Sequence, residues 1–154
     1  MILRIVLGTV LAAMALGQLA SFDAMPAILT TYGLTSGAAS TALAVALISA
    51  QAVTALWFLA RPRSHAAPPV WLYTGVALVW SALAAQAFAR GLVLDNCGCF
   101  GANLSQPLRW YVLVEDALML LNAWLLWRGL RRARPTSLTA GAALVAARRQ
   151  QENH

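Results

Sequence analysis

Four long and nearly unbroken apolar stretches constrain the fold of this chain more than any other feature. They cover residues 3–20, 38–60, 70–89 and 110–127. Their lengths are close to the ~20 apolar residues that a helix needs to cross a hydrocarbon core about 30 Å thick. None alternates apolar with polar residues, as the strands of a membrane β-barrel do. We therefore predict an all-α integral membrane protein, folded as an antiparallel four-helix bundle.

The composition agrees with a membrane protein. Hydrophobic residues make up 60% of the 154 and charged residues only 10%, whereas a soluble domain carries about 25% charged residues. The first stretch, preceded by Arg4, also resembles a signal peptide, but three further spans and no soluble domain favour a first membrane helix. We expect a four-span domain over residues 1–130 and a basic cytoplasmic tail over residues 131–154, in which residues 135–154 are frayed or weakly helical.

The basic residues predict the orientation of the bundle. All eleven are arginine, and nine of them lie before the first span, between the second and third, or after the fourth. Only Arg90 and Arg109 lie on the other side. By the positive-inside rule, both termini then face the cytoplasm, and the connection between the third and fourth spans faces the periplasm or cell exterior of a bacterial cytoplasmic membrane. The net charge of +6 follows from this asymmetry and requires no nucleic acid partner.

That outward connection holds both cysteines of the chain, Cys97 and Cys99, with Gly98 between them. Thiols so close can form a disulfide, and glycine permits the tight turn. A disulfide that closes so small a loop removes little chain entropy, so it contributes little as a structural clip. A metal site would need more ligands, and both histidines lie on the other side. We predict an exposed, strained and exchangeable redox pair, with a structural disulfide as the alternative.

Polar side chains in the outer half of the spans are expected beneath the cysteine loop. They are Gln18, Gln86, Glu115 and Asp116. Acids at such depth are costly unless they reach water, pair with a base or are protonated. Two interpretations stay open: the acids snorkel to the interface and cap the fourth helix, or they line a polar pocket serving the thiols, with Arg109 as partner. Gln51 lies deeper and is expected to make an interhelical hydrogen bond.

A cofactor site is a further hypothesis from the same residues. A membrane quinone needs a lipid-accessible apolar pocket with a few polar contacts. Gln18, Gln86, Trp110 and Asp116 are the candidates to supply it, although Trp110 also suits an aromatic belt at the outer interface.

The connection between the first two spans, residues 22–34, carries apolar residues near helical spacing, including Met25, Leu29 and Tyr32. Such spacing indicates a helix but does not decide its place. It either lies on the membrane surface as a short separate helix or extends the first span.

The run from Cys97 to Gly101, CGCFG, followed by Trp110 and a final apolar helix, resembles the methylamine utilisation protein MauE family, which is related to the DoxX-like four-helix membrane proteins. The resemblance extends over residues 1–128. It also covers the stretches Tyr32-Gly33-Leu34 and Arg90-Gly91. The chain departs from the family pattern in three features: Ser21 and Phe22 stand where a lysine is usual, Gln51 replaces an acid, and Glu115, with Asp116 beside it, takes the place expected for an arginine.

The resemblance implies a role in thiol–disulfide exchange outside the cytoplasmic membrane. It would link the chain to maturation of the disulfide-rich methylamine dehydrogenase, with a thioredoxin-like or disulfide-containing partner. Cys97 and Cys99 would then be the reacting residues, supported by Gly98 and Phe100 of the motif and by Arg109, Glu115 and Asp116.

The number of cysteines limits the mechanism. A relay that carries electrons across the membrane by thiol exchange needs a second pair on the cytoplasmic side, and this chain has only two cysteines. Electrons would leave to a membrane quinone, another redox subunit or a thiol partner on the same face. The competing hypothesis is a non-catalytic scaffold that docks a redox partner.

Overall fold

The computed structural model describes residues 1–152, with side chains described for residues 1–132, 148 and 151; residues 153–154 of the predicted tail lie outside it. The described chain is helical throughout, without strands, as predicted. Its elements are α1 (Ile2–Ala20), the 3₁₀ helix η1 (Phe22–Ala24), α2 (Met25–Thr31), α3 (Ala38–Ala60), α4 (Pro68–Ala89) and α5 (Trp110–Glu152).

Four of these helices are long and apolar enough to cross a membrane: α1, α3, α4 and the part of α5 from Trp110 to Arg132. Their limits lie within a few residues of the predicted spans. Helix α4 begins two residues earlier than predicted, at Pro68. Proline is favoured in the first turn because its missing N–H has no intrahelical partner there.

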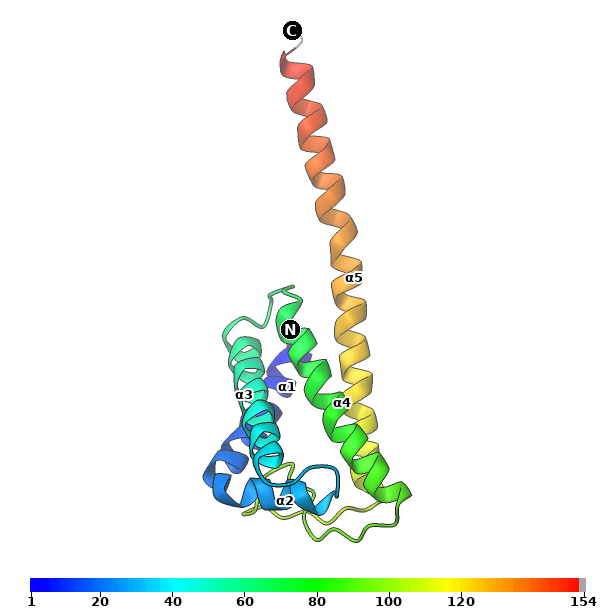
Figure 1. The fold of residues 1–154 in the computed structure, drawn as a ribbon. Coiled ribbons are helices and arrows are strands. Elements are labelled where there is room, and N and C mark those ends of the chain that lie inside the picture. Colours follow the sequence, from blue (N-terminus) through cyan, green and yellow to red (C-terminus); the bar gives the residue numbers. More distant parts are fainter. Residues whose placement is uncertain (153–154) are drawn as a thin grey trace.

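The four long helices form an antiparallel bundle (Figure 1). Helix α1 packs on α3, α3 on α4, and α4 on α5. We call the end that holds α2 and residues 90–109 the cysteine-loop end. The opposite end holds Met1, the connection of residues 61–67 and the arginines from Arg128 to Arg132, and we call it the arginine-rich end. Large apolar side chains such as Leu56, Leu78 and Leu118 are exposed on the outside of the bundle, as lipid contact requires.

Helix α2 lies across the cysteine-loop end as a separate short helix (Figure 1). Ser21 ends α1, and Pro26 lies in the first turn of α2. Met25, Leu29 and Tyr32 are buried beneath this cover. Of the two interpretations of residues 22–34, the separate helix is therefore right, and it covers the bundle end instead of extending α1.

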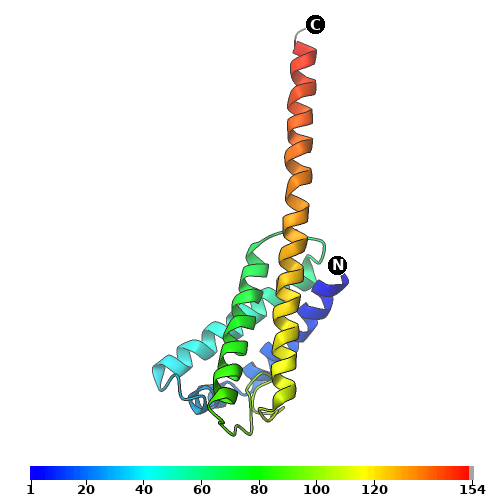
Figure 2. The same ribbon diagram turned by 90° about the vertical axis from the view of Figure 1, so that its right-hand side faces the viewer.

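The tail differs from the expectation. Helix α5 continues without interruption to Glu152, far beyond the ends of the other helices (Figure 2). Alanine and arginine are strong helix formers, and the preceding span has already overcome the nucleation penalty. These two facts account for a helix where the sequence predicted a frayed or weakly helical segment.

One buried polar residue of α3 also differs. Gln51 is fully buried, yet neither its amide nitrogen nor its amide oxygen has a hydrogen-bond partner. The interhelical hydrogen bond expected of it is absent from the described structure. The nearby Thr54 instead donates to the carbonyl of Ala50 within its own helix, at 2.7 Å.

Candidate functional site

The connection that carries the cysteines is a folded unit. Its two arms are joined by backbone hydrogen bonds from Cys97 N–H to the Gln106 carbonyl (2.8 Å) and from Leu108 N–H to the Leu94 carbonyl (2.9 Å). Cys97 and Cys99 lie in the turn beyond these bonds. These two hydrogen bonds hold the backbone around Cys97 without any contribution from the helix bundle.

Asn96 shapes the turn itself. Its side-chain oxygen accepts from Gly98 N–H at 2.9 Å, and its side-chain nitrogen donates to the Gly101 carbonyl at 3.1 Å. Gly98 and Gly101 both have φ +79°, a left-handed conformation that disfavours side chains. A Cβ on Gly98 would also come within 2.9 Å of Ile28. The CGCFG run therefore needs its glycines for the backbone path and for close packing under α2.

The turn docks on the end of α1. The buried Gln18 amide donates to the carbonyls of Cys99 (2.8 Å) and Gly98 (3.3 Å). Ser21 Oγ accepts from Ala102 N–H at 2.8 Å. The Phe100 carbonyl lies directly against Gly17, where a Cβ would overlap it. Gln18 was predicted to lie beneath the cysteine loop, and the structure gives it the loop backbone as its partner.

Tyr32, at the end of α2, holds the other side of the turn. Its buried hydroxyl donates to the Cys97 carbonyl at 2.8 Å. Burial raises the pKa of the Tyr32 phenol well above its ordinary value, so the hydroxyl keeps the proton that it donates. The Tyr32 carbonyl in turn accepts from Gln86 (3.2 Å) and Arg90 (3.3 Å). Gln86 and Arg90 thus act on the cysteine loop through Tyr32.

The two thiols are free and differ in exposure. Cys97 is buried, with 1% of its surface exposed, while Cys99 is partly exposed. The sequence predicted an exposed pair; this is wrong for Cys97, because α2 and Tyr32 pack against the turn. Residues 22–31 fold back over a connection some seventy positions later in the chain. No pattern among neighbouring residues predicts this contact.

The thiols share a hydrogen bond that separates their proton affinities. The bond from the Cys99 side chain lowers the pKa of the Cys97 thiol against the opposing effect of burial, with help from the Cys99 backbone N–H. The same bond, together with burial, raises the pKa of the Cys99 thiol. Cys97 is therefore the first to become a thiolate, while Cys99 retains its proton.

The two acids of the fourth span occupy different environments. Asp116 is buried, with 6% of its surface exposed, and its Oδ2 has no hydrogen-bond partner. Glu115 is exposed and accepts from the Gln106 amide at 3.2 and 3.4 Å. Arg109 is exposed as well, and the structure pairs it with neither acid. Both acids nevertheless raise the pKa of the Cys97 thiol by charge repulsion, so they lie on the thiol side of the bundle.

The quinone candidates do not share one environment. Gln18 binds the loop backbone, and Gln86 binds the Tyr32 carbonyl. Trp110 is 68% exposed and contacts the Tyr111 ring edge to face, with 6.2 Å between ring centroids. This exposed position agrees with the interpretation of Trp110 as part of an aromatic belt at the outer interface. Among residues with described side chains, no three His, Cys, Asp or Glu side chains gather as a metal site.

Comparison with known proteins assigns the family. The sequence model for "Methylamine utilisation protein MauE" matches residues 1–128, which include the first three spans, the cysteine loop and most of the fourth span. The chain belongs to the MauE family. A MauE relative, "Methylamine utilization protein MauE" of Paracoccus denitrificans, is 29% identical over 140 residues, covering 91% of this chain and 74% of the relative. No solved structure matches the chain.

The contacts of Tyr32 and Gly17 were not predicted from the sequence. Tyr32 was identified as part of an apolar helical face and of the MauE resemblance, without a role. A buried tyrosine hydroxyl normally requires a hydrogen-bond partner, so its place on an apolar face was a usable signal. Gly17 carried no such signal, because its importance depends on a carbonyl from a distant loop.

We predict that Tyr32→Phe loosens the cysteine loop. The variant removes one hydroxyl and leaves the buried Cys97 carbonyl without that partner, a loss that costs about 1–3 kcal/mol. Thermal unfolding in detergent should show the destabilisation. Tyr111→Phe is the control, since its hydroxyl donates to Pro107 from a less buried position. Equal effects of the two variants would contradict a specific role for Tyr32.

Proposed function

We propose that this MauE-family protein is a membrane thiol–disulfide redox protein that exchanges disulfides through Cys97 and Cys99. The observation that carries the proposal is the pair itself: two free thiols one residue apart in a folded turn, with Cys99 the more exposed residue. Gln18 and Tyr32 hold their backbone in place. A fixed dithiol with one lowered pKa suits reversible exchange.

We infer the order of exchange from the unequal exposure of the two cysteine residues. In the oxidised form, a partner thiolate attacks Cys99 Sγ; a partner–Cys99 disulfide forms, the Cys97–Cys99 bond breaks, and Cys97 leaves as a thiolate. A low pKa makes Cys97 the better leaving group. The partner's second thiol loses its proton and displaces Cys99. Two electrons pass to the pair, the two cysteines take up two protons, and the partner is left with a disulfide.

The same steps run backwards when the partner is the stronger oxidant. Cys97, as thiolate, then resolves the disulfide between Cys99 and the partner. Asp116, buried on the thiol side with an unpartnered oxygen, and Glu115 act as the nearby proton acceptors. Gly98 and Phe100 maintain the turn that keeps the two sulfurs within reach.

The partner class follows from the orientation. The arginine asymmetry supports a cytoplasmic arginine-rich end and a cysteine-loop end facing the periplasm or cell exterior of a bacterial inner membrane. Disulfides persist in that compartment. We propose a thioredoxin-like protein or a maturing disulfide-containing protein as the partner. The name of the Paracoccus relative supports a place in methylamine utilisation, with methylamine dehydrogenase as the maturing protein.

Repeated exchange requires an outlet for electrons. The chain has only two cysteines, so it does not form a thiol relay across the membrane by itself. A membrane quinone, a second redox subunit or the thiol partner itself completes the cycle.

A scaffold without redox activity is the second candidate. It is favoured by the burial of Cys97, because structural thiols are usually buried. In that case the folded turn serves as a recognition element for a redox partner, and Cys97 and Cys99 have no reaction to perform.

A redox titration tests the proposal against the scaffold. The purified protein is equilibrated in thiol–disulfide buffers of stepped potential, and the free cysteines are counted by alkylation and intact mass. We expect the pair to interconvert at a potential above about −300 mV, the limit below which structural disulfides lie. The double variant Cys97→Ala/Cys99→Ala gives the background. A pair that stays oxidised below that limit, or never forms a disulfide, would exclude exchange.

A further inference from the structure

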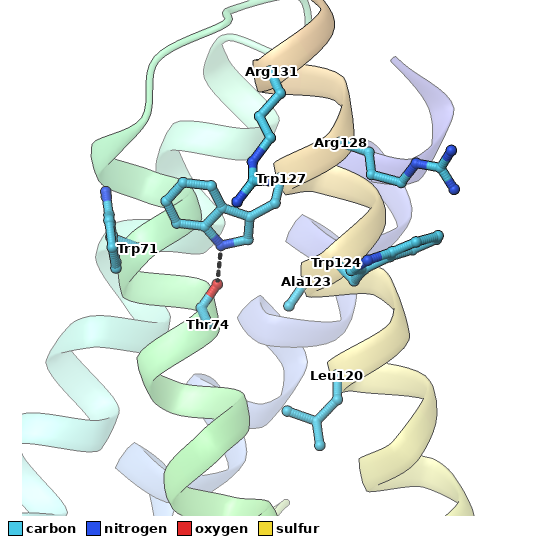
Figure 3. A pocket seen from close by; sticks show the side chains of 8 residues that line it. All are labelled: Trp71, Thr74, Leu120, Ala123, Trp124, Trp127, Arg128 and Arg131. Carbon is cyan, nitrogen blue, oxygen red and sulfur yellow. Dashed lines mark hydrogen bonds between the residues drawn. The ribbon is translucent and has the colours of Figure 1, made fainter.

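An open groove lies between α4 and α5 at the arginine-rich end, opposite the thiols. Its volume is about 670 Å³. Figure 3 shows its lining, which combines apolar and aromatic side chains with two arginines: Trp71, Thr74, Leu120, Ala123, Trp124, Trp127, Arg128 and Arg131. The thiol chemistry proposed above uses none of these residues.

One wall of the groove is held rigidly. Trp127 Nε1 donates to Thr74 Oγ1 at 3.2 Å, which joins α5 to α4. The Trp71 and Trp127 rings meet edge to face, with 4.5 Å between centroids. Trp127 therefore has its polar atom satisfied and presents ring surface to the groove. Tryptophan in this arrangement is typical of the boundary between headgroups and hydrocarbon.

The other feature of the groove is positive charge. Arg128 stacks over the Trp124 ring, with its guanidinium carbon 4.4 Å from the centroid. Arg131 extends from α5 toward Trp127, while Arg128 and Trp124 lie on the other side of α5 (Figure 3). Both arginines are exposed. Their guanidinium groups are thus free to bind an anion, and arginine pairs with phosphate oxygens by two parallel hydrogen bonds.

No acid competes for these arginines. Of the five acidic residues of the chain, Asp23, Asp95, Glu115 and Asp116 belong to the cysteine-loop end. The fifth, Glu152, follows Arg132 by twenty helical residues, about 30 Å along α5. Among the residues whose side chains the structure describes, none supplies a negative charge to the groove.

The length of the groove indicates an amphiphile instead of a free anion. Leu120 and Arg131 are eleven helical residues apart, a rise of about 16 Å. That distance is about half the thickness of the hydrocarbon core. A ligand that fills the groove has its anionic group at the arginines and an apolar part reaching along Ala123 to Leu120.

We propose that this groove binds one anionic phospholipid of the surrounding leaflet. The phosphate binds Arg131 beside Trp127, Arg128 adds positive charge on the other flank of the groove, and an acyl chain packs along Trp124, Ala123 and Leu120. The site is independent of the thiol function, and it couples α4 to α5 through a lipid at the end opposite the cysteine loop.

Native mass spectrometry with added lipid tests the site. The full-length protein, in neutral detergent, is titrated with phosphatidylglycerol and with phosphatidylcholine, and the bound fraction is counted. We expect phosphatidylglycerol to bind more tightly. Each arginine is worth about fivefold in affinity, so R128Q/R131Q should weaken phosphatidylglycerol binding about 25-fold. Both positions are exposed, and a melting curve confirms that the variant is folded.

The matched control is R61Q/R63Q. It removes the same charge from the same end of the bundle but touches no residue of the groove. We expect it to change phosphatidylglycerol affinity less than about twofold. Equal weakening by the two double variants would mean diffuse attraction and would overturn the site. So would equal binding of the two lipids, displacement by inorganic phosphate alone, or preference for a neutral quinone over phosphatidylglycerol.

Discussion

Replacing Cys97 with alanine should give a protein that retains a mixed disulfide on Cys99, whereas replacing Cys99 should leave a protein that hardly reacts with disulfides. The Cys97→Ala variant keeps Cys99, the residue with the larger exposed fraction, and loses the thiol that resolves a mixed disulfide. Incubation with glutathione disulfide should therefore leave a lasting glutathione adduct on Cys99. The wild-type pair should pass through the same adduct and resolve it to an internal disulfide.

The Cys99→Ala variant provides the contrast. It keeps Cys97, which is buried where α2 and Tyr32 pack against the turn, and it removes the hydrogen bond that is the main cause of the lowered Cys97 pKa. Both changes slow attack on glutathione disulfide, by about tenfold or more relative to Cys97→Ala. Intact mass spectrometry against time measures both rates.

Two outcomes would contradict this assignment. Equal adduct formation by the two single variants would mean that the exposure of the two cysteine residues does not set the order of attack. Unchanged partner maturation in cells carrying either single variant or the double variant would remove the redox function altogether and leave the scaffold. Cys97→Ser should behave as Cys97→Ala does, since a hydroxyl cannot resolve a disulfide.

The arrangement of the spans was largely predictable from the sequence. Apolar length alone locates four helices, and Pro68 and Pro69 fix the start of α4 through their own stereochemistry. These are local properties, readable from a window of neighbours. The same reasoning was wrong for the tail, because the composition of residues 131–154 was judged without the helix that precedes it.

The redox chemistry of the two cysteines stays a prediction from the sequence. The depth of Gln18 in its span placed it near them, as the structure has it. The partner of Gln18 was not predictable, because it is the carbonyl of Cys99, 81 residues away. Arg109 and Glu115 were expected to act together. Glu115 instead accepts a hydrogen bond from the Gln106 side chain, and the Gln106 carbonyl accepts one from Cys97 N–H on the opposite arm of the loop.

The strongest unpredicted feature is the cover over Cys97. Residues 22–31 fold across the bundle end, so that Tyr32 reaches the loop and Cys97 is buried. The burial of Cys97 and the exchange that we propose at Cys99 rest on this one arrangement. A cysteine in a loop is expected to be exposed. Cys97 is buried instead, because the connection between the first two spans lies over it.

Gly17→Ala should displace the cysteine loop from α1. A Cβ at this position would overlap the Phe100 carbonyl, a backbone atom that moves only with the turn. The shift would strain the neighbouring hydrogen bonds from Gln18 to Cys99 and from Ala102 to Ser21. We expect a loss of about 1–3 kcal/mol in unfolding free energy, as for overpacked cores. Maleimide should also modify Cys97 faster, because the turn no longer seals it.

Gly75→Ala is the matched control for this variant. Gly75 also lies within a membrane-spanning helix, but a Cβ there would meet nothing within 4 Å. The same substitution should therefore leave Cys97 labelling unchanged and stabilise α4 by about 0.5–1 kcal/mol. Because the two variants add the same methyl group, their difference isolates the contact between α1 and the loop. If Gly17→Ala retains both the wild-type stability and the wild-type labelling rate of Cys97, the loop does not dock on α1, and the selective exposure of Cys99 loses its structural basis.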